Sequence, residues 1–245
     1  TIKNQRMNQI IRLTLSVFLV LQFSNQYAQI THGSILFERK TNLLKKFKNT
    51  DQQKWLRGEK VKIDRFNLYF SPENSVFVPD ENAIPSKADW ATSKNTVIQD
   101  FKNEERISIY NLFGEKKTVK DELIKREWKI TERKRIIAGY SCRRAIWPKN
   151  DSTRIYAWYT DQILPSTGPE TFNGLPGTIL GLATEDGGVV YFAKKVEDKN
   201  QNINEIISEI KIKKTYTESE LKQELKEKSK SNPWMSKIMD YLFEW

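Results

Sequence analysis

The sequence predicts a mainly β (α+β) fold: a twisted antiparallel meander sheet, or a half-barrel, with helices at its C-terminal end. Three observations support this prediction. Short segments rich in β-branched and aromatic residues follow one another closely, with turn-forming residues between them. No long helical pattern separates these segments, as βαβ units would require. A strong helix signal begins only near residue 217.

The expected strands are closely spaced along the chain. They cover residues 33–39, 61–70, 75–78, 95–101, 106–113, 119–131, 134–146, 154–160, 178–184, 189–196 and 204–213. Residues 61–70 alternate between apolar and polar side chains, which is typical of a strand with one buried face. Residues 43–56 are polar and rich in lysine, and we expect a loop or a short helix there. Turn residues at 71–74, 114–117 and 185–188 predict antiparallel hairpins.

The C-terminal part has a different character. Thr217 and Glu220 have the spacing of a capping box, in which each residue satisfies a backbone amide of the other. The charged segment 221–228 is therefore expected to be a helix, which Asn232-Pro233 would end. Residues 234–245 form a second, amphipathic segment with apolar residues at near-helical spacing. We interpret it as a helix that docks on the sheet, with contact to a membrane surface or partner as the alternative.

Residues 155–182 carry the strongest local pattern in the chain. An aromatic run at 156–159 suits a half-buried strand, and an apolar run at 178–182 re-enters the sheet. The residues that break the pattern between these runs are Pro165, Gly168, Pro169, Gly174, Pro176 and Gly177. Glycine reaches positive φ without steric cost and proline fixes φ, so together they hold a loop in a defined path.

The same stretch resembles the signature of a known family. Residues 174–179, with the sequence GLPGTI, resemble the motif of the GLPGLI family, although Thr178 replaces an apolar residue. Three further elements occur in the family's order: residues 137–145 (IAGYSCRRA), residues 157–160 (AWYT) and Gly168-Pro169. The family consists of small exported proteins found mostly in the Bacteroidota, and it has no established activity. The resemblance therefore implies export but no particular reaction.

Residues 1–28 have the pattern of a signal peptide. Lys3, Arg6 and Arg12 accompany an apolar run at residues 13–23, which is too short for a stable membrane span. Ala28 suits a cleavage site, and the alternative interpretations are a membrane anchor or a core helix. Cleavage would leave residues 29–245 as a single domain with a helical tail from about residue 217. We then expect the protein in the periplasm or at the outer membrane.

Charge limits the classes of partner. The chain has 41 Lys and Arg residues against 31 Asp and Glu residues, which gives a formal net charge of +10. Residues 1–28 hold three of the basic residues and no acidic residue, so +7 remains in the rest of the chain. The excess is spread out, which indicates a solvated surface rather than a nucleic-acid site. It would also favour an anionic membrane surface or an acidic envelope protein. We interpret the basic run at 133–135 as a turn between strands, with an anionic partner as the alternative.

The sequence offers few groups for catalysis. His32 is the only histidine and Cys142 the only cysteine, so an internal disulfide is excluded and a zinc site would lack its usual ligands. We expect Cys142 to be a small buried side chain, with activation of the thiol by the flanking arginines as the alternative. No motif for a nucleophile, a phosphate or a cofactor is present. We therefore expect no catalytic site, no metal and no cofactor.

Two functions agree with these features. The first is a non-enzymatic binding module for an apolar ligand or an extended peptide. The second is an accessory or structural subunit of an outer-membrane protein complex. The candidate binding residues are Trp158, Tyr159, Phe172, Gly174, Leu175, Pro176 and Gly177. For the GLPG loop itself we favour a structural role, because leucine is commonly buried and glycine adopts conformations closed to other residues. Presentation of Leu175 to a partner is the alternative.

Overall fold

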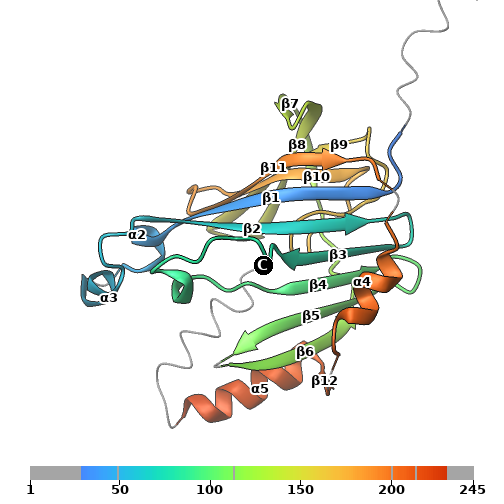
Figure 1. Cartoon of the computed structure of the whole chain (residues 1–245). Helices are drawn as coiled ribbons and strands as arrows, with labels where there is room; N and C mark the ends of the chain where they lie inside the picture. The colour runs from blue at the N-terminus through green and yellow to red at the C-terminus, as the bar shows by residue number, and fades with distance from the viewer. Residues whose placement is uncertain (1–28, 49, 113, 200, 213, 231–245) are drawn as a thin grey trace, which may run out of the picture.

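A computed structural model describes residues 29–48, 50–112, 114–199, 201–212 and 214–230, which form one large sheet. The strands are β1 (Gly33–Asn42), β2 (Val61–Phe70), β3 (Asn74–Pro79), β4 (Thr96–Asp100), β5 (Glu105–Leu112), β6 (Glu115–Glu122), β7 (Lys129–Ile137), β8 (Tyr140–Asn150), β9 (Thr153–Thr160), β10 (Thr178–Thr184), β11 (Val189–Glu197) and β12 (Thr215–Tyr216). Their order across the sheet is β12-β6-β5-β4-β3-β2-β1-β11-β10-β9-β8-β7 (Figure 1).

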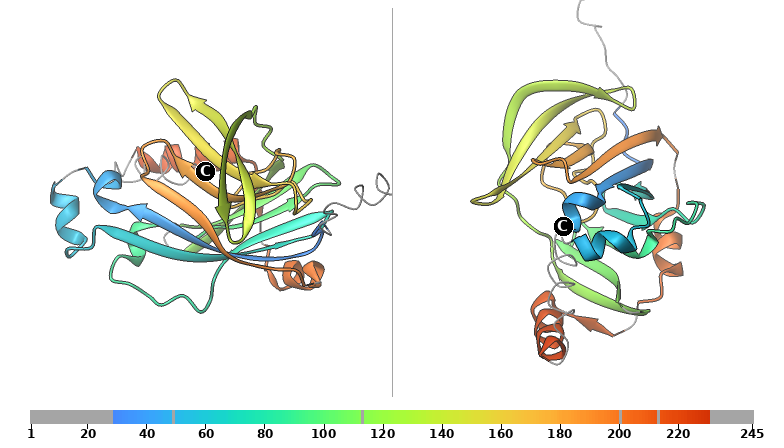
Figure 2. Two further views of the ribbon diagram at one scale, coloured as in Figure 1. Left: turned by 90° about the horizontal axis from the view of Figure 1, so that it is seen from above. Right: turned by 90° about the vertical axis from the view of Figure 1, so that its left-hand side faces the viewer.

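Two antiparallel meanders make up this sheet. Strands β2 to β6 form the first meander, and strands β7 to β11 form the second. Strand β1 joins them, because Ser34 lies opposite Tyr69 of β2 on one side and Glu197 of β11 on the other. The right panel of Figure 2, which faces one end of the strands, shows how strongly the sheet curves. The expected twisted antiparallel sheet is therefore confirmed, and the sheet remains open between β7 and β12.

The two faces of the sheet carry different helices. On the outer face, α4 (Ile203–Glu209) packs against Val76 of β3 and Ile98 of β4. On the inner face, α5 (Glu218–Ser229) packs Leu221 and Leu225 against β5 and β6. Three short helices lie in the loops next to β1, β2 and β4: α2 (Leu43–Lys46), α3 (Thr50–Trp55) and η1 (Asp89–Ala91). Only the inner face of the central strands carries the main core.

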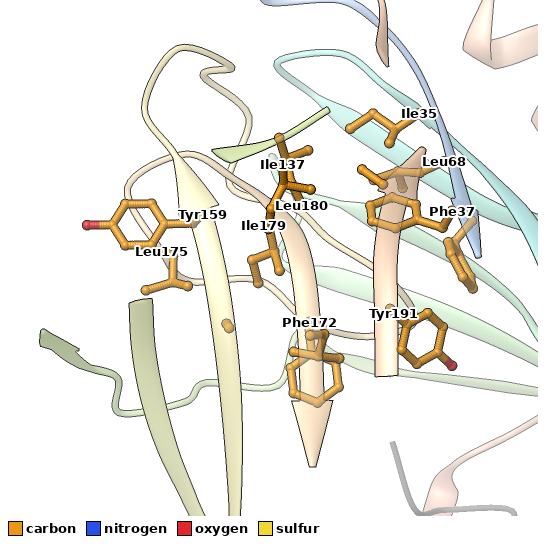
Figure 3. Packing of buried hydrophobic residues seen from close by; sticks show 14 of the residues in the cluster. Ile35, Phe37, Leu68, Ile137, Tyr159, Phe172, Leu175, Ile179, Leu180 and Tyr191 are labelled. Atoms are coloured by element: carbon orange, nitrogen blue, oxygen red, sulfur yellow. The ribbon is translucent and has the colours of Figure 1, made fainter. Parts of the chain in front are cut away.

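Alternation along the strands builds that core. In β2 every second residue is buried, from Lys62 to Phe70, while the residues between them are exposed or half-buried. Successive side chains of a strand point to opposite faces, so this pattern aims one set of side chains into the sheet's concave side. The largest buried cluster collects buried side chains from β1, β2, β3, β4, β7, β8, β9, β10 and β11 and from the loop before β10 (Figure 3).

Several local predictions are confirmed. Strand β10 spans the predicted residues 178–184, and β2 spans the predicted residues 61–70. The short helices α2 and α3 fall within the region expected to be loop or helix. The capping box is present: the backbone N–H of Glu220 donates to Thr217 Oγ1 at 3.2 Å, and the N–H of Thr217 donates to Glu220 Oε2 at 2.7 Å.

The strand predicted at residues 204–213 is wrong, because helix α4 occupies most of it. The apolar residues of α4 and its C-cap are Ile203, Ile206, Ile207 and Ile210. Spacings of three and four place these residues on one face of a helix, whereas a strand would divide them between both faces. The isoleucines pack together on the outer face of the sheet, so the helical period decides the structure despite the β propensity of isoleucine.

The boundaries predicted between residues 119 and 146 are also wrong. Strand β6 already ends at Glu122, residues 123–128 are irregular, and β7 runs through the basic residues 133–135 that were predicted to be a turn. The turn lies instead at Ala138 and Gly139, whose φ angles are +49° and +88°. Two successive positive φ angles are the requirement of a type I′ turn, which matches the twist of the two strands that it joins.

Two predicted segments lie outside the described residues. They are the signal peptide at residues 1–28 and the amphipathic segment at residues 234–245. Within the described part of the chain, the helices are all too short or too polar to cross a bilayer.

Candidate functional site

The loop at residues 161–177, between β9 and β10, lies across the inner face of the sheet. Thr167 Oγ1 donates to Ser75 Oγ of β3 at 2.8 Å, and the Asn173 side-chain amide donates to Gln99 Oε1 of β4 at 2.6 Å. All four of these side chains are buried. The loop is therefore fixed to the far meander by hydrogen bonds that water does not reach, each of which would be costly to break.

Its GLPG segment has a structural core. Leu175 is 3% exposed and belongs to the main core cluster. Gly177 has φ +128°, and a Cβ atom there would lie 2.0 Å from the carbonyl oxygen of Thr160. Only glycine fits such a close approach of two backbone segments. Gly174 also has a positive φ, of +87°, but it is exposed.

The seven candidate binding residues do not form one surface. Tyr159, Phe172 and Leu175 are buried in the core cluster, as Figure 3 shows, and Gly177 is buried between backbones. Trp158 lies on the opposite face of β9, where its ring is 6.2 Å from that of Phe192. Of the seven, only Gly174 and Pro176 are exposed on the loop.

An apolar groove lies at one end of the sheet, beside the exposed part of this loop. It has a volume of about 410 Å³. Its lining residues are Thr31, Pro72, Phe101, Leu123, Leu164, Pro165, Ser166, Asn173 and Gly174. They come from the entry to β1, the β2–β3 turn, the segments after β4 and β6, and the loop. Antiparallel pairing brings these connections to the same end of the sheet.

The polar groups of the groove wall already have partners. Ser166 Oγ accepts from the backbone N–H of Gly174 at 2.8 Å, and the backbone carbonyl of Asn173 accepts from Trp128 Nε1 at 2.9 Å. The Asn173 side chain donates to Gln99. Because these groups are satisfied inside the protein, the wall offers mainly carbon atoms to a ligand. Binding sites for small apolar molecules commonly have this volume and this type of lining.

A second feature of the inner face is a buried ionic cluster. Arg39 of β1 donates to Asp64 of β2 at 2.8 Å, and its guanidinium lies 3.6 Å from Glu170 of the loop. Tyr191 of β11 donates to Glu170 at 2.8 Å, and Thr92 donates to Asp64 at 2.8 Å. The side chains of Arg39, Asp64 and Glu170 are at most 4% exposed. Three ionisable side chains thus tie β1, β2 and the loop together inside the core.

Lys62 extends this cluster toward the surface. Its ammonium lies 3.3 Å from Asp64 and 2.7 Å from Asp89, which is about one third exposed. Asp64 therefore faces two cations, Arg39 and Lys62. A buried charge with partners of opposite sign avoids most of the cost of leaving water, whereas an unpaired one does not.

The two buried carboxyl groups differ in pKa. Burial alone would raise the pKa of Asp64, but the charge of Arg39 and the hydrogen bonds from Arg39 and Thr92 outweigh it, so the pKa lies below its ordinary value. Burial raises the pKa of Glu170, and the opposing effect of Arg39 is too weak to cancel it. Arg39 and Asp64 therefore form the charged pair, whereas the pKa of Glu170 lies above its ordinary value.

We predict that Glu170→Gln flattens the dependence of stability on pH. The folded carboxyl keeps its proton at pH values where the unfolded one has lost it, so native Glu170 lowers stability as pH rises above the ordinary value of 4.5. A neutral amide lacks this effect. Urea denaturation at about pH 5 and about pH 8 measures it. The exposed Glu209→Gln is the matched control, and an unchanged slope in Glu170→Gln would contradict the prediction.

Cys142 and His32 occupy separate structural settings. Cys142 is fully buried, and burial raises the pKa of its thiol to about 12. His32 is half-buried, with Nδ1 2.8 Å from Thr31 Oγ1. Across the described ranges, no group of three or more His, Cys, Asp or Glu side chains is arranged to hold a metal ion. The structure thus makes Cys142 a protonated core side chain rather than a reactive thiolate.

Sequence reasoning missed the ionic cluster and most of the groove. The sequence did contain one indication of the cluster. Arg39 and Asp64 stand at the alternate positions of β1 and β2 that also hold Phe37 and Phe66, and those positions face the core. A charge at an inward position needs a buried partner. Glu170, the third member, stands in the irregular loop with φ +54°, where no periodic pattern marks a residue as buried.

Comparisons with known proteins agree with this geometry. Residues 147–181, which include β9 and the loop, match the family model described as "Protein of unknown function (Porph_ging)". No curated protein matches the chain. Two structures of PNGF-II, in space groups C2 and P21, are similar with a TM-score of 0.55 and identities of 15% and 17%. The alignments cover 79% of this chain but 32% of the PNGF-II chain, so this chain matches about a third of that protein. At such identities the likeness shows the fold alone.

Proposed function

We propose that the chain is an exported member of the GLPGLI family and a non-enzymatic binding module of the periplasm or outer membrane. Its ligand is an apolar molecule, or the apolar side chains of an extended peptide. The family model of unknown function matches the same stretch that carries the GLPG residues, which supports the assignment. The signal-like residues 1–28 support export, and N-terminal sequencing of the protein from the envelope fraction tests it.

The groove beside the loop is the observation that carries this proposal. Its wall combines Phe101, Leu123 and Leu164 from three distant parts of the chain. The side chains of Ser166 and Asn173 are hydrogen-bonded inside the protein, so they do not depend on water that an apolar ligand would displace. The hydrogen bonds from Thr167 and Asn173 hold the loop in place before a ligand arrives, which lowers the ordering cost of binding.

Leu164→Glu is expected to weaken the binding of phenylnaphthylamine, a neutral apolar dye, by about tenfold or more, because a carboxylate would enter an apolar wall. Leu164 is 46% exposed, so the fold should tolerate the change. Ile84→Glu is the matched control: Ile84 is 88% exposed and does not line the groove. Dye fluorescence titration measures affinity, and thermal melts check that both variants are folded. Equal affinities of the two variants would refute the assignment of the site.

The second candidate, an accessory subunit of an outer-membrane complex, has support from another feature. Tyr156, Trp158 and Phe192 form a row of half-buried rings on the outer face, away from the groove. Such a row is an interface candidate, because aromatic side chains are enriched where proteins meet. Purification from native envelopes separates the two functions: a bound lipid or small molecule favours the binding module, and a stoichiometric protein favours the subunit.

A further inference from the structure

The two edge strands of the sheet, β6 with β12 at one side and β7 at the other, differ in how their backbone groups are paired. At one edge, β12 pairs in parallel with β6, and the backbone N–H of Glu218 in α5 donates to Asp121 at 2.7 Å. At the other edge of the sheet, β7 pairs with β8 through one of its two backbone edges. Within the described part of the chain, no other element hydrogen-bonds to the backbone of residues 129–137. The outward N–H and C=O groups of β7 are therefore open to a further strand.

Strand β7 also has an excess of positive charge. It contains Lys129, Arg133, Lys134 and Arg135 against the single acid Glu132, and all five side chains are exposed. Glu132 forms an ion pair with Arg143 of β8, with a nitrogen–oxygen distance of 3.2 Å. None of the four basic side chains has a carboxylate within ion-pair distance among the residues described. Their charge is thus available to a partner.

The side chains on and next to β7 also determine what an added strand would contact. The guanidinium of Arg135 lies over the rings of Trp158 and Phe192, at 5.1 Å and 5.2 Å, which holds it flat on the outer face. Ile136, on the other face of β7, is 69% exposed, and Ile130 is 41% exposed. Arg133 and Arg135 share one face of β7, and Lys134 shares the other face with Ile136. An incoming strand would therefore find cations on both faces and an exposed β-branched side chain on one of them.

We propose that the outer edge of β7 binds an extended acidic peptide, which adds to the sheet as a further strand. Backbone hydrogen bonds supply affinity, and acidic side chains opposite the basic residues of β7 supply selectivity. Alternating apolar residues of the peptide pack beside Ile136. A second copy of this chain does not fit, because two β7 edges would place like charges opposite each other. This surface is independent of the apolar groove.

Fluorescence anisotropy with a short labelled peptide of alternating glutamate and valine tests the proposal. Wild-type protein should bind it, and the double variant Arg133→Glu/Lys134→Glu should bind it more weakly by about tenfold or more. The double variant Lys60→Glu/Lys87→Glu is the control, because it makes the same change in net charge at exposed residues elsewhere. Leu164→Glu should bind the peptide as wild type does, which keeps this test separate from that of the groove.

Two control peptides identify the mode of binding. A lysine–valine peptide should not bind, because its charge repels β7. A glutamate–valine peptide with N-methyl groups at all its amides keeps its charge but has no backbone N–H to donate from either edge, and it should not bind either. The proposal is overturned if the wild type does not bind the acidic peptide, if the N-methylated peptide binds equally well, or if both charge variants lose affinity equally.

Discussion

Asp64→Asn is expected to lower the free energy of unfolding by about 3–5 kcal/mol, which is a large part of the stability of an ordinary domain. Asp64 is fully buried and lies between Arg39 and Lys62, at 2.8 Å and 3.3 Å. Asparagine has nearly the same shape but no charge. The substitution therefore leaves the buried guanidinium with Glu170 as its one acidic neighbour among the described residues, and burial raises the pKa of Glu170. The cost comes from the unpaired cation rather than from a cavity.

Urea denaturation at neutral pH measures this loss. Asp51→Asn is the control, because Asp51 forms an ion pair with Lys54 on the surface, with both side chains about three quarters exposed. Exposed pairs contribute little, so this variant should unfold almost as the wild type does. The double variant Arg39→Met/Asp64→Leu should lose less unfolding free energy than the sum of the losses in Arg39→Met and Asp64→Leu, since the two side chains interact directly. If Asp64→Asn has wild-type stability, the cluster does not hold the fold.

Gly177→Ala is expected to cost more than about 3 kcal/mol of stability, through steric collision as well as backbone strain. The new Cβ would meet the Thr160 carbonyl oxygen at 2.0 Å, and both groups belong to backbone that cannot move without breaking the β9–β10 pairing. Gly58→Ala separates the two causes. Gly58 also has a positive φ, of +86°, but nothing lies within 4 Å of the added atom.

Thermal and urea unfolding of the two variants gives the comparison. Gly58→Ala should show only the strain of a positive φ, about 1 kcal/mol. The difference between the variants then measures the close approach of the loop to β9. Similar losses in both variants would mean that the loop backbone shifts freely at Gly177, and that its path is not fixed by this contact.

The sequence predicts what depends on neighbours along the chain. The alternation in residues 61–70 is visible because each inward residue repeats at the next but one position. The capping box of α5 and the Gly-rich turn before β11 are equally local. The prediction failed at α4 because isoleucine favours strands by propensity, while its spacing favours a helix. It failed at β7 because the turn residues Ala138 and Gly139 were assigned to the interior of a strand.

The candidate sites depend on contacts that no local pattern contains. The groove needs Thr31, Pro72 and Leu123 at one end of the sheet, which follows only once the strand order is known. The ionic cluster needs Glu170 to reach Arg39 across the inner face. Inward charges in β1 and β2 could have indicated that a buried partner exists. They could not identify Glu170 as that partner, because residues in an irregular loop show no alternation of apolar and polar side chains that would mark a buried position.

The strand order also determines when the sheet can be completed during synthesis. The first meander, with β1 beside β2, uses only residues before 123 and can form early. The pairing of β1 with β11, as at Ser34 and Glu197, must wait until nearly the whole chain has been made. Contacts so distant in sequence form slowly. During that delay the second edge of β1 is unpaired and offers a template to other chains. A chaperone that covers this edge would protect the half-built protein, and the last hairpin, β10–β11, would displace it.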